Sequence, residues 1–301
     1  MKIVVLAGGT GGAKLAAGFQ SLVAPGELTV IANTADDDEF WGLLICPDVD
    51  ATIYRLAGVF DAAAGYGQAG DTFHTLETLE RLGEPAWFRI GDRDLATHLL
   101  RAQMLDGGCR LTETALELCR RFKLQTRVVP MTDDKVRTRF VTDAGNLSFQ
   151  EYFVRERLGP LLRAIEIAGG DVASPSPEAA AALAEADLVV IGPSNPLISI
   201  APILEVLGRR MDRERTMGVT PIVGGAALKG PTVAMLRALG SEATPVEVAR
   251  SYKSVAGTFV IDSRDSGSAG EIEAMGYRVI VCNTVMTDDG QSLAKSILEA
   301  V

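Results

Sequence analysis

The feature that most constrains this chain is a glycine-rich stretch directly after its first apolar run. Residues 1–7 read Met-Lys-Ile-Val-Val-Leu-Ala, which is typical of a strand buried on both faces. Residues 8–14, Gly-Gly-Thr-Gly-Gly-Ala-Lys, follow at once, and residues 15–19 take up a helical spacing. This order places the N–H groups and positive dipole end of a helix beside a strand end, where they can bind a phosphate.

The glycine stretch matches neither of the common nucleotide-binding fingerprints. Lys14 stands where the dinucleotide motif G-x-G-x-x-G has its last glycine, and Leu15 follows the lysine where a Walker A motif has Ser or Thr. One interpretation is therefore a tight turn without a ligand. The other is a phosphate site in which a lysine adds a positive charge, and its expected members are Gly9, Thr10, Gly11, Gly12 and Lys14.

Composition and charge exclude several classes of protein. The chain has 301 residues, of which 47% are apolar and 23% charged, as in ordinary globular proteins. A net charge of −10 and the lack of a basic stripe argue against a nucleic-acid partner. The 4 cysteines are scattered, no signal peptide precedes the first strand, and no apolar run reaches membrane-spanning length. A cytoplasmic protein without a membrane partner is expected.

Apolar runs alternate with helical spacings along the chain. This pattern predicts one Rossmann-like α/β domain over residues 1–301, with three αβα layers around a mainly parallel sheet. Strands are expected at residues 1–7, 28–32, 87–90, 127–131, 187–191, 220–223, 259–262 and 277–281. Helices are expected after residue 14 and near residues 48–56, 72–82, 92–102, 111–122, 179–186 and 292–300.

One segment breaks this alternation. Residues 136–141 alternate in polarity, residues 143–146 form a turn, and residues 147–154 are expected to be extended, which predicts a β-hairpin. Residues 136–168 are therefore interpreted as an inserted cap. Its aromatic side chains could pack on a flat ligand, although a small core of the insert's own is the more common arrangement; they are Phe149, Tyr152 and Phe153.

Acidic residues follow the second expected strand. Asn33 stands at the strand tip, where a nicotinamide-binding protein has an acid for the ribose, so Asn33 and Lys14 disfavour a dehydrogenase. Four carboxylates near a phosphate site suit Mg²⁺, which takes one or two carboxylates plus phosphate oxygens and water. A solvated acidic loop, with one acid capping a helix, fits the spacing about as well. The four are Asp36, Asp37, Asp48 and Asp50.

Further polar turns follow other expected strands, at the edge of the sheet where ligands bind in open α/β folds. Arg89 and Arg93 could bind an anion or be neutralised by neighbouring acids, and His98 is assigned to the core slightly in preference to the site. Ser194 and Asn195 could face a phosphate or a base, or belong to an ordinary proline-rich turn. A third glycine-rich turn is expected at residues 224–231.

Taken together, these stretches resemble the 2-phospho-L-lactate transferase family of coenzyme F-420 biosynthesis. The most specific matches are Gly-Asp-Arg-Asp-Leu-Ala-Thr-His at residues 91–98 and Phe-Gln-Glu-Tyr-Phe-Val-Arg at residues 149–155. Other matches, in family order, are residues 8–14, 33–37, 47–50, 70–72 and 192–196. The last seventy residues resemble the family only in general pattern.

The resemblance implies transfer of a three-carbon phosphoacid group from its guanosine-diphosphate-linked form to the terminal hydroxyl of the deazaflavin Fo, with release of GMP. The acid could be phospholactate, phosphoenolpyruvate or phosphoglycerate. Mg²⁺ and a homodimer are expected. By position, Asp50 and Arg89 would touch the deazaflavin, although many members have lysine in place of the arginine.

The residues can be assigned roles in this chemistry, which needs mainly positioning and charge neutralisation. Asp36 and Asp50 are the expected metal ligands and catalytic residues, with Asp50 also placed to orient or deprotonate the acceptor hydroxyl. Substrate contacts are expected from the glycine turn with Lys14 and from Asn33, Arg89, Asp92, Arg93, Ser194 and Asn195. The alternative is a nucleotide-sugar-binding regulator of the gluconeogenesis-factor type, which shares the opening glycine turn.

Overall fold

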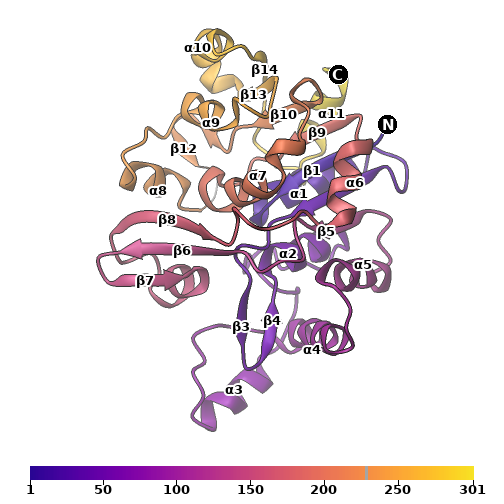
Figure 1. Ribbon diagram of the computed structural model, residues 1–301, viewed down its shortest axis with the longest axis vertical. Helices are drawn as coiled ribbons and strands as arrows, with labels where there is room; N and C mark the ends of the chain where they lie inside the picture. The colour runs from indigo at the N-terminus through magenta and orange to yellow at the C-terminus, as the bar shows by residue number, and fades with distance from the viewer. Residues whose placement is uncertain (228–229) are drawn as a thin grey trace.

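A seven-stranded parallel sheet runs through the centre of the molecule (Figure 1). The computed structural model describes residues 1–227 and 230–301. Along the sheet the strands lie in the order β14-β13-β10-β9-β1-β2-β5. Their bounds are β1 Ile3–Ala7, β2 Leu28–Ala32, β5 Arg127–Pro130, β9 Leu188–Ile191, β10 Thr216–Val219, β13 Thr258–Asp262 and β14 Arg278–Cys282. The predicted α/β fold with a mainly parallel sheet is confirmed.

Helices cover both faces of this sheet. Because side chains alternate along a strand, Ile3 and Val5 of β1 enter one buried cluster and Val4 and Leu6 enter another. Residues of α1 Gly9–Gln20, α2 Pro47–Leu56, α5 Leu111–Arg121 and α11 Gln291–Glu299 belong to the first cluster. Residues of α6 Pro177–Glu185, α7 Ala201–Leu207, α9 Pro245–Tyr252 and α10 Ala269–Ala274 belong to the second. The three layers are thus helix, sheet and helix.

The strand order reverses between β1 and β9. From β1 the chain adds β2 and β5 on one side, and it then returns to place β9, β10, β13 and β14 on the other. The turns after β1 and β9 therefore diverge from one point, where open α/β sheets bind their ligands.

Two expected strands are placed differently. Residues 87–90 form no strand, and their aromatic side chains instead pack against the hairpin of β3 Asp38–Phe40 and β4 Leu43–Ile45, with Phe88 stacked on Phe40 at 4.0 Å between centroids. A central strand was expected at residues 220–223, but the strand in the sheet at this point is β10, which begins four residues earlier at Thr216. Residues 222–223 are β11, which pairs with β12 Ala226–Ala227 in a small hairpin. Leu228 and Lys229 of the third glycine turn lie outside the described residues.

The insert is a three-stranded antiparallel sheet beside the main one, in the order β7-β6-β8. Its strands are β6 Arg137–Thr142, β7 Gly145–Ser148 and β8 Leu162–Ala168. The predicted hairpin is therefore present, but the extended segment expected to reach residue 154 ends earlier and gives way to a π-helix, η1 Glu151–Arg155. Phe149, Tyr152 and Phe153 pack around Phe140 in the core of the insert, as the more common interpretation predicts.

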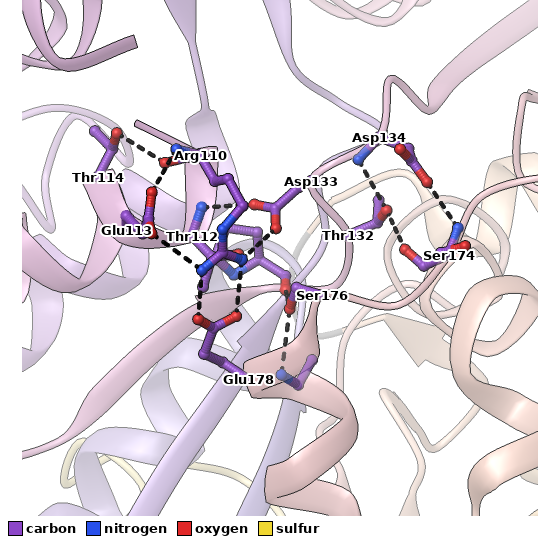
Figure 2. Close-up of polar contacts among 12 residues, drawn as sticks. Arg110, Thr112, Glu113, Thr114, Thr132, Asp133, Asp134, Ser174, Ser176 and Glu178 are labelled. Atoms are coloured by element: carbon purple, nitrogen blue, oxygen red, sulfur yellow. Dashed lines mark hydrogen bonds and ion pairs between the residues drawn. The ribbon is translucent and has the colours of Figure 1, made fainter. Parts of the chain in front are cut away.

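The root of the insert is held by polar contacts between the outgoing and the returning chain (Figure 2). Thr132 Oγ1 donates to the carbonyl of Ser174 at 2.5 Å, and the N–H of Ser174 donates to Asp134 Oδ2 at 2.8 Å. Beside them, Arg110 binds Asp133 at 2.8 Å and Glu178 at 2.7 Å, which ties the starts of α5 and α6 to the same segment. These contacts fix the insert relative to the sheet.

The remaining elements complete the surface. α3 His74–Arg81 lies beyond the β3–β4 hairpin, at the lower end of the molecule in Figure 1, and α4 Asp92–Asp106 lies beside β4. Short helical elements are η2 Pro196–Ile200, η3 Gly208–Arg210, η4 Arg213–Arg215, α8 Thr232–Ala238 and η5 Ser263–Ser268. Within residues 1–227 and 230–301, no helix has both the length and the apolar character needed to cross a membrane.

Candidate active site

A cavity of about 410 Å³ lies where the starts of α1 and α2 meet the insert and the segment around Trp87. One part of its wall is apolar and aromatic: Ile45, Tyr54, Tyr66, Trp87 and Phe88. Carboxylates and a histidine line another part: Asp48, Asp50, Asp94 and His98. Two arginines also line it, Arg89 from the Trp87 segment and Arg157 from the insert. The cavity thus combines a surface suited to a flat ring with groups of both charges.

Asp48 occupies the N-terminus of α1. Its Oδ1 accepts a hydrogen bond from the N–H of Gly9, and its Oδ2 accepts one from Asn33 Nδ2 at 2.9 Å. Burial raises the pKa of Asp48 to about 6, although the hydrogen bonds from Asn33 and Gly9 act in the opposite direction. One helix N–H expected to bind a phosphate is therefore already bound to a carboxylate of the protein.

The glycines of the turn serve packing against the turn after β9. A Cβ on Gly11 would lie 2.1 Å from the carbonyl oxygen of Pro193, and one on Gly12 would lie 2.7 Å from Ala7 Cβ. Ser194 Oγ accepts from the N–H of Gly12 at 3.0 Å. The close approach that requires glycine at positions 11 and 12 is thus to the protein itself, whereas Gly9 and Thr10 line the cavity.

Three residues expected at the phosphate site have other partners in the structure. Lys14 Nζ donates to the carbonyl of Met286, and Asn195 Oδ1 accepts from the N–H of Leu197 at 2.9 Å, which caps η2. Ser194 is buried against the glycine turn. None of the three is among the residues that line the cavity.

Asp36 and Asp37 are buried, with 4% and 2% of their surfaces exposed, and they are not among the residues that line the cavity. Burial and the negative charge of Asp48 raise the pKa of Asp36 well above its ordinary value, and burial raises that of Asp37 to about 8. In the described part of the chain, one carboxylate oxygen of each has no hydrogen-bond partner. Gln150 of the insert donates to the carbonyl of Asp36 at 3.0 Å and also lines the cavity.

Asp50 is held by a buried arginine that the sequence did not suggest. Arg101 Nη2 donates to Asp50 Oδ1, while Arg101 Nη1 donates to the carbonyl of Leu44 at 3.1 Å and lies 3.1 Å from His98 Nδ1. Burial has the largest single effect on the pKa of Arg101 and lowers it, but the charge and hydrogen bond of Asp50, together with Cys46 and Tyr54, raise it by more, so the net shift is upward. The other oxygen of Asp50, Oδ2, has no hydrogen-bond partner among the described residues, and Asp50 lines the cavity.

His98 connects Asp50 to a second carboxylate. Its Nδ1 lies 3.7 Å from Asp50 Oδ2 and its Nε2 lies 3.4 Å from Asp94 Oδ1. Tyr54 donates to the same oxygen of Asp94 at 2.7 Å. The histidine is buried, as the core interpretation predicts, and it also lines the cavity. The family-like stretch at residues 91–98 therefore contributes His98 and Asp94, which lie next to Asp50 and help to position it.

Asp92 and Asp71 cap each other's helices. Asp92 accepts from Thr72 Oγ1 at 2.6 Å and from the N–H groups of His74 and Thr75 at 3.0 Å, so it caps α3. Asp71 accepts from the N–H groups of residues 93 and 94 at the start of α4. Arg93 donates to the carbonyl of Ala69 at 2.8 Å. Asp92 and Arg93 thus shape the loops around the cavity and do not line it.

The residues that the sequence did not single out lie on three different elements. Arg101 and Tyr54 stand on helices at positions that read as ordinary helical residues, while Gln150 and Arg157 come from the insert. The family-like stretch at residues 149–155 is the only sequence signal that includes one of them. No group of three or more His, Cys, Asp or Glu side chains in residues 1–227 and 230–301 is arranged to hold a metal by itself.

Comparison with protein families gives a match over almost the whole chain. The family model of 2-phospho-L-lactate transferase CofD matches residues 3–296. The similarity to this family therefore continues well beyond the motifs at residues 8–196 that carried the resemblance in the sequence.

Relatives with assigned names are similar over nearly their full lengths. A "phosphoenolpyruvate transferase" of Streptomyces griseus is 39% identical over 298 residues, covering 96% of this chain and 94% of the relative. A "2-phospho-L-lactate transferase" of Methanosarcina mazei is 34% identical over 302 residues, covering 99% of this chain and 100% of the relative.

Among solved structures, the fold is similar to that of a UPF0052 family protein from Bacillus halodurans. The TM-score is 0.64 at 16% sequence identity, with 99% of this chain and 98% of the other covered.

Proposed function

Because the chain belongs to the 2-phospho-L-lactate transferase CofD family, we propose that it makes a precursor of coenzyme F-420. The proposed reaction transfers a three-carbon phosphoacid group from its guanosine-diphosphate-linked form to the terminal hydroxyl of the deazaflavin Fo. The acceptor oxygen attacks the phosphorus that carries the three-carbon acid. The bond from that phosphorus to the bridging oxygen breaks, GMP leaves, and the hydroxyl proton passes to a base.

The observation that best supports this proposal is that one cavity contains both Asp50 and Arg89. These are the two residues that the family resemblance assigns to the deazaflavin. Aromatic side chains beside them, Trp87 and Phe88, offer a flat surface for a ring system. The guanidinium of Arg89 is itself held over the ring of Phe73, at 4.2 Å from its centroid.

In the proposed mechanism Asp50 is the group that acts on the acceptor hydroxyl. Arg101 holds Oδ1 in place, which leaves Oδ2 directed to accept the hydroxyl proton or to orient the hydroxyl. His98 and Asp94 support this arrangement from behind. The insert contributes Gln150, Val154 and Arg157 to the opposite wall and restricts access of water, which would compete as an acceptor.

The residues also fit the proposed Mg²⁺. Buried carboxylate oxygens without hydrogen-bond partners, on Asp36, Asp37 and Asp50, are groups that a cation would satisfy. Mg²⁺ needs only one or two carboxylates when phosphate oxygens and water complete its shell, so the lack of a three-residue cluster among the described residues is compatible with it. Asp50 and Asp36 would hold the ion, which would neutralise charge on the diphosphate.

The experiment that tests the proposal supplies Fo, Mg²⁺ and each of three guanosine-diphosphate-linked acids: phospholactate, phosphoenolpyruvate and phosphoglycerate. Mass spectrometry should identify one coupled product and GMP. The names of the relatives divide between phosphoenolpyruvate and phospholactate, so these two donors are compared first. No product with any of the three would contradict the proposal.

A binding measurement separates the transferase from a nucleotide-sugar-binding regulator. Thermal shifts with GDP and with UDP-N-acetylglucosamine should show greater stabilisation by GDP. A larger shift with the UDP-sugar would favour the regulator. Size measurements on the same sample test the proposed homodimer.

A further inference from the structure

Arg157 is an arginine without an ion-pair partner among the described residues, and it lines a cavity to which three carboxylates also contribute. Its neighbour Arg155 pairs with Glu151 and Glu156, each at 2.9 Å. In residues 1–227 and 230–301, by contrast, no carboxylate lies within 4.0 Å of the guanidinium of Arg157. Because Asp48, Asp50 and Asp94 line the same cavity, an anionic ligand group would be attracted to Arg157 and repelled by the carboxylates.

The backbone of Arg157 has a conformation that normally favours glycine. Its φ is +51° and that of Leu158 is +60°, and only Glu156 separates Arg157 from the end of the π-helix η1. The N–H of Leu158 donates to the carbonyl of Tyr152 at 2.9 Å, and the Leu158 side chain packs in the core of the insert. Leu158 thus has a structural use in this turn. The side chain of Arg157 is exposed and does not pack in the core of the insert. Non-glycine residues with a positive φ, like Arg157, are concentrated at functional sites.

The insert that carries Arg157 is anchored to the rest of the protein by two sets of contacts. Its root is held by the contacts among Thr132, Asp134 and Ser174 (Figure 2). Gln150, at the start of the π-helix, is bound to the carbonyl of Asp36 at 3.0 Å. The segment that carries Arg157 is therefore attached both at its root and at the acidic loop.

We propose that Arg157 binds the carboxylate of the three-carbon acid in the donor, and thereby selects donors that carry this group. The assignment rests on the proposed function. A guanidinium presents paired N–H donors that match a planar carboxylate. The diphosphate is expected near Asp36 and Asp50 through Mg²⁺, and Arg89 is assigned to the deazaflavin, so of the two arginines that line the cavity Arg157 remains for the carboxylate.

The test compares the true donor with an analogue in which the carboxylate is a primary carboxamide. Wild-type protein should use the amide roughly 10- to 100-fold less efficiently in kcat/KM, the range for losing a charge-assisted hydrogen bond. Arg157→Gln should lose a similar factor with the true donor and no longer distinguish it from the amide. The KM for the deazaflavin should be unchanged. Arg163→Gln, which removes an exposed arginine of the same insert outside the cavity, is the matched control and should behave like wild type.

A second variant separates recognition from folding. Arg157→Gly removes the side chain and suits the positive φ. Its melting temperature should equal or exceed that of wild type, while its donor selectivity should be lost as in Arg157→Gln. Arg157→Lys should restore part of the preference for the carboxylate.

Two outcomes would overturn the assignment while leaving the proposed function intact. One is an unchanged ratio of carboxylate to amide donor in Arg157→Gln. The other is a rise in KM for the deazaflavin without a change in donor selectivity. A wild-type protein that transfers no acid from any donor would instead overturn the proposed function, and the assignment with it.

Discussion

Arg101 and Asp50 form an ion pair in which both side chains are almost completely buried, with 1% and 5% of their surfaces exposed. A buried carboxylate that loses its partner is costly, because neither water nor another cation replaces it. We therefore expect Arg101→Met to lower the free energy of unfolding by about 3–5 kcal/mol, as measured by chemical denaturation. Arg101→Lys keeps the charge but not the fork that also reaches Leu44 and His98. The Arg101→Lys variant should therefore fold and have a lower kcat than wild type. If Arg101→Met had the same denaturant midpoint of unfolding as wild type, the predicted loss of stability would be contradicted.

Asp50→Asn should fold, with a lower stability than wild type because the buried Arg101 loses the charge of its partner, and it should lower kcat by roughly 10²- to 10⁴-fold, the usual contribution of a general base. The amide keeps the shape of the side chain but cannot accept the acceptor's proton. Steady-state kinetics measure the loss, and circular dichroism checks the fold. Asp106→Asn, at the exposed end of α4 and outside the cavity, is the matched control. Wild-type turnover by Asp50→Asn would remove Asp50 from the mechanism.

Gly11→Ala should destabilise the protein by about 1–3 kcal/mol, the usual cost of overpacking. The added Cβ would lie 2.1 Å from the carbonyl oxygen of Pro193, so the turns after β1 and β9 would have to separate. Gly270→Ala is the control, because no atom lies within 4 Å of its Cβ position and its φ is not positive. Thermal unfolding should show a lower melting temperature for Gly11→Ala and an equal or higher one for Gly270→Ala.

Asp92 should make stability depend on pH in the acid range. Hydrogen bonds, first from Thr72 and then from the N–H groups at the start of α3, lower the pKa of Asp92 below its ordinary value. A carboxyl whose pKa is lower in the folded state stabilises the protein above its unfolded pKa of about 4. That contribution is lost as the pH falls through the lower, folded value. Melting temperatures of wild type and Asp92→Asn should therefore differ at pH 7, and the difference should shrink progressively as the pH falls from about 4 toward the lowered pKa of the folded state. A difference in melting temperature that did not change with pH would contradict the role of the Asp92 carboxylate as the cap of α3.

The central strands could be predicted because they are buried on both faces and so read as continuous apolar runs. β1 and β9 are examples. The same rule failed at residues 87–90, where Trp87 and Phe88 are apolar because they pack against the β3–β4 hairpin. It also missed β10, whose Thr-Met-Gly-Val sequence lacks the β-branched run of a typical buried strand.

The candidate site was accessible from sequence only in part. Asp50 and Arg89 were named from a family resemblance, and one cavity contains both. Arg101 was not found, since an arginine on a helix usually faces solvent and only the tertiary structure brings it to Asp50. Lys14 was placed at a phosphate site because it follows the glycines, whereas its helical position directs it to Met286. The position of Lys14 after the glycines predicted that it lies near the start of α1, but did not predict on which face of the helix its side chain lies.

The root of the insert has a consequence for how members of this family can diverge in sequence. The chain leaves the sheet near Thr132 and rejoins it near Ser174, and these two residues are bonded to each other. Residues between them can therefore be lengthened, shortened or exchanged while the parallel sheet still closes in the same way. Under the proposed function, selection for a different three-carbon acid can act on this inserted sheet, while the carboxylates proposed to carry out the transfer lie outside it and remain under separate constraint.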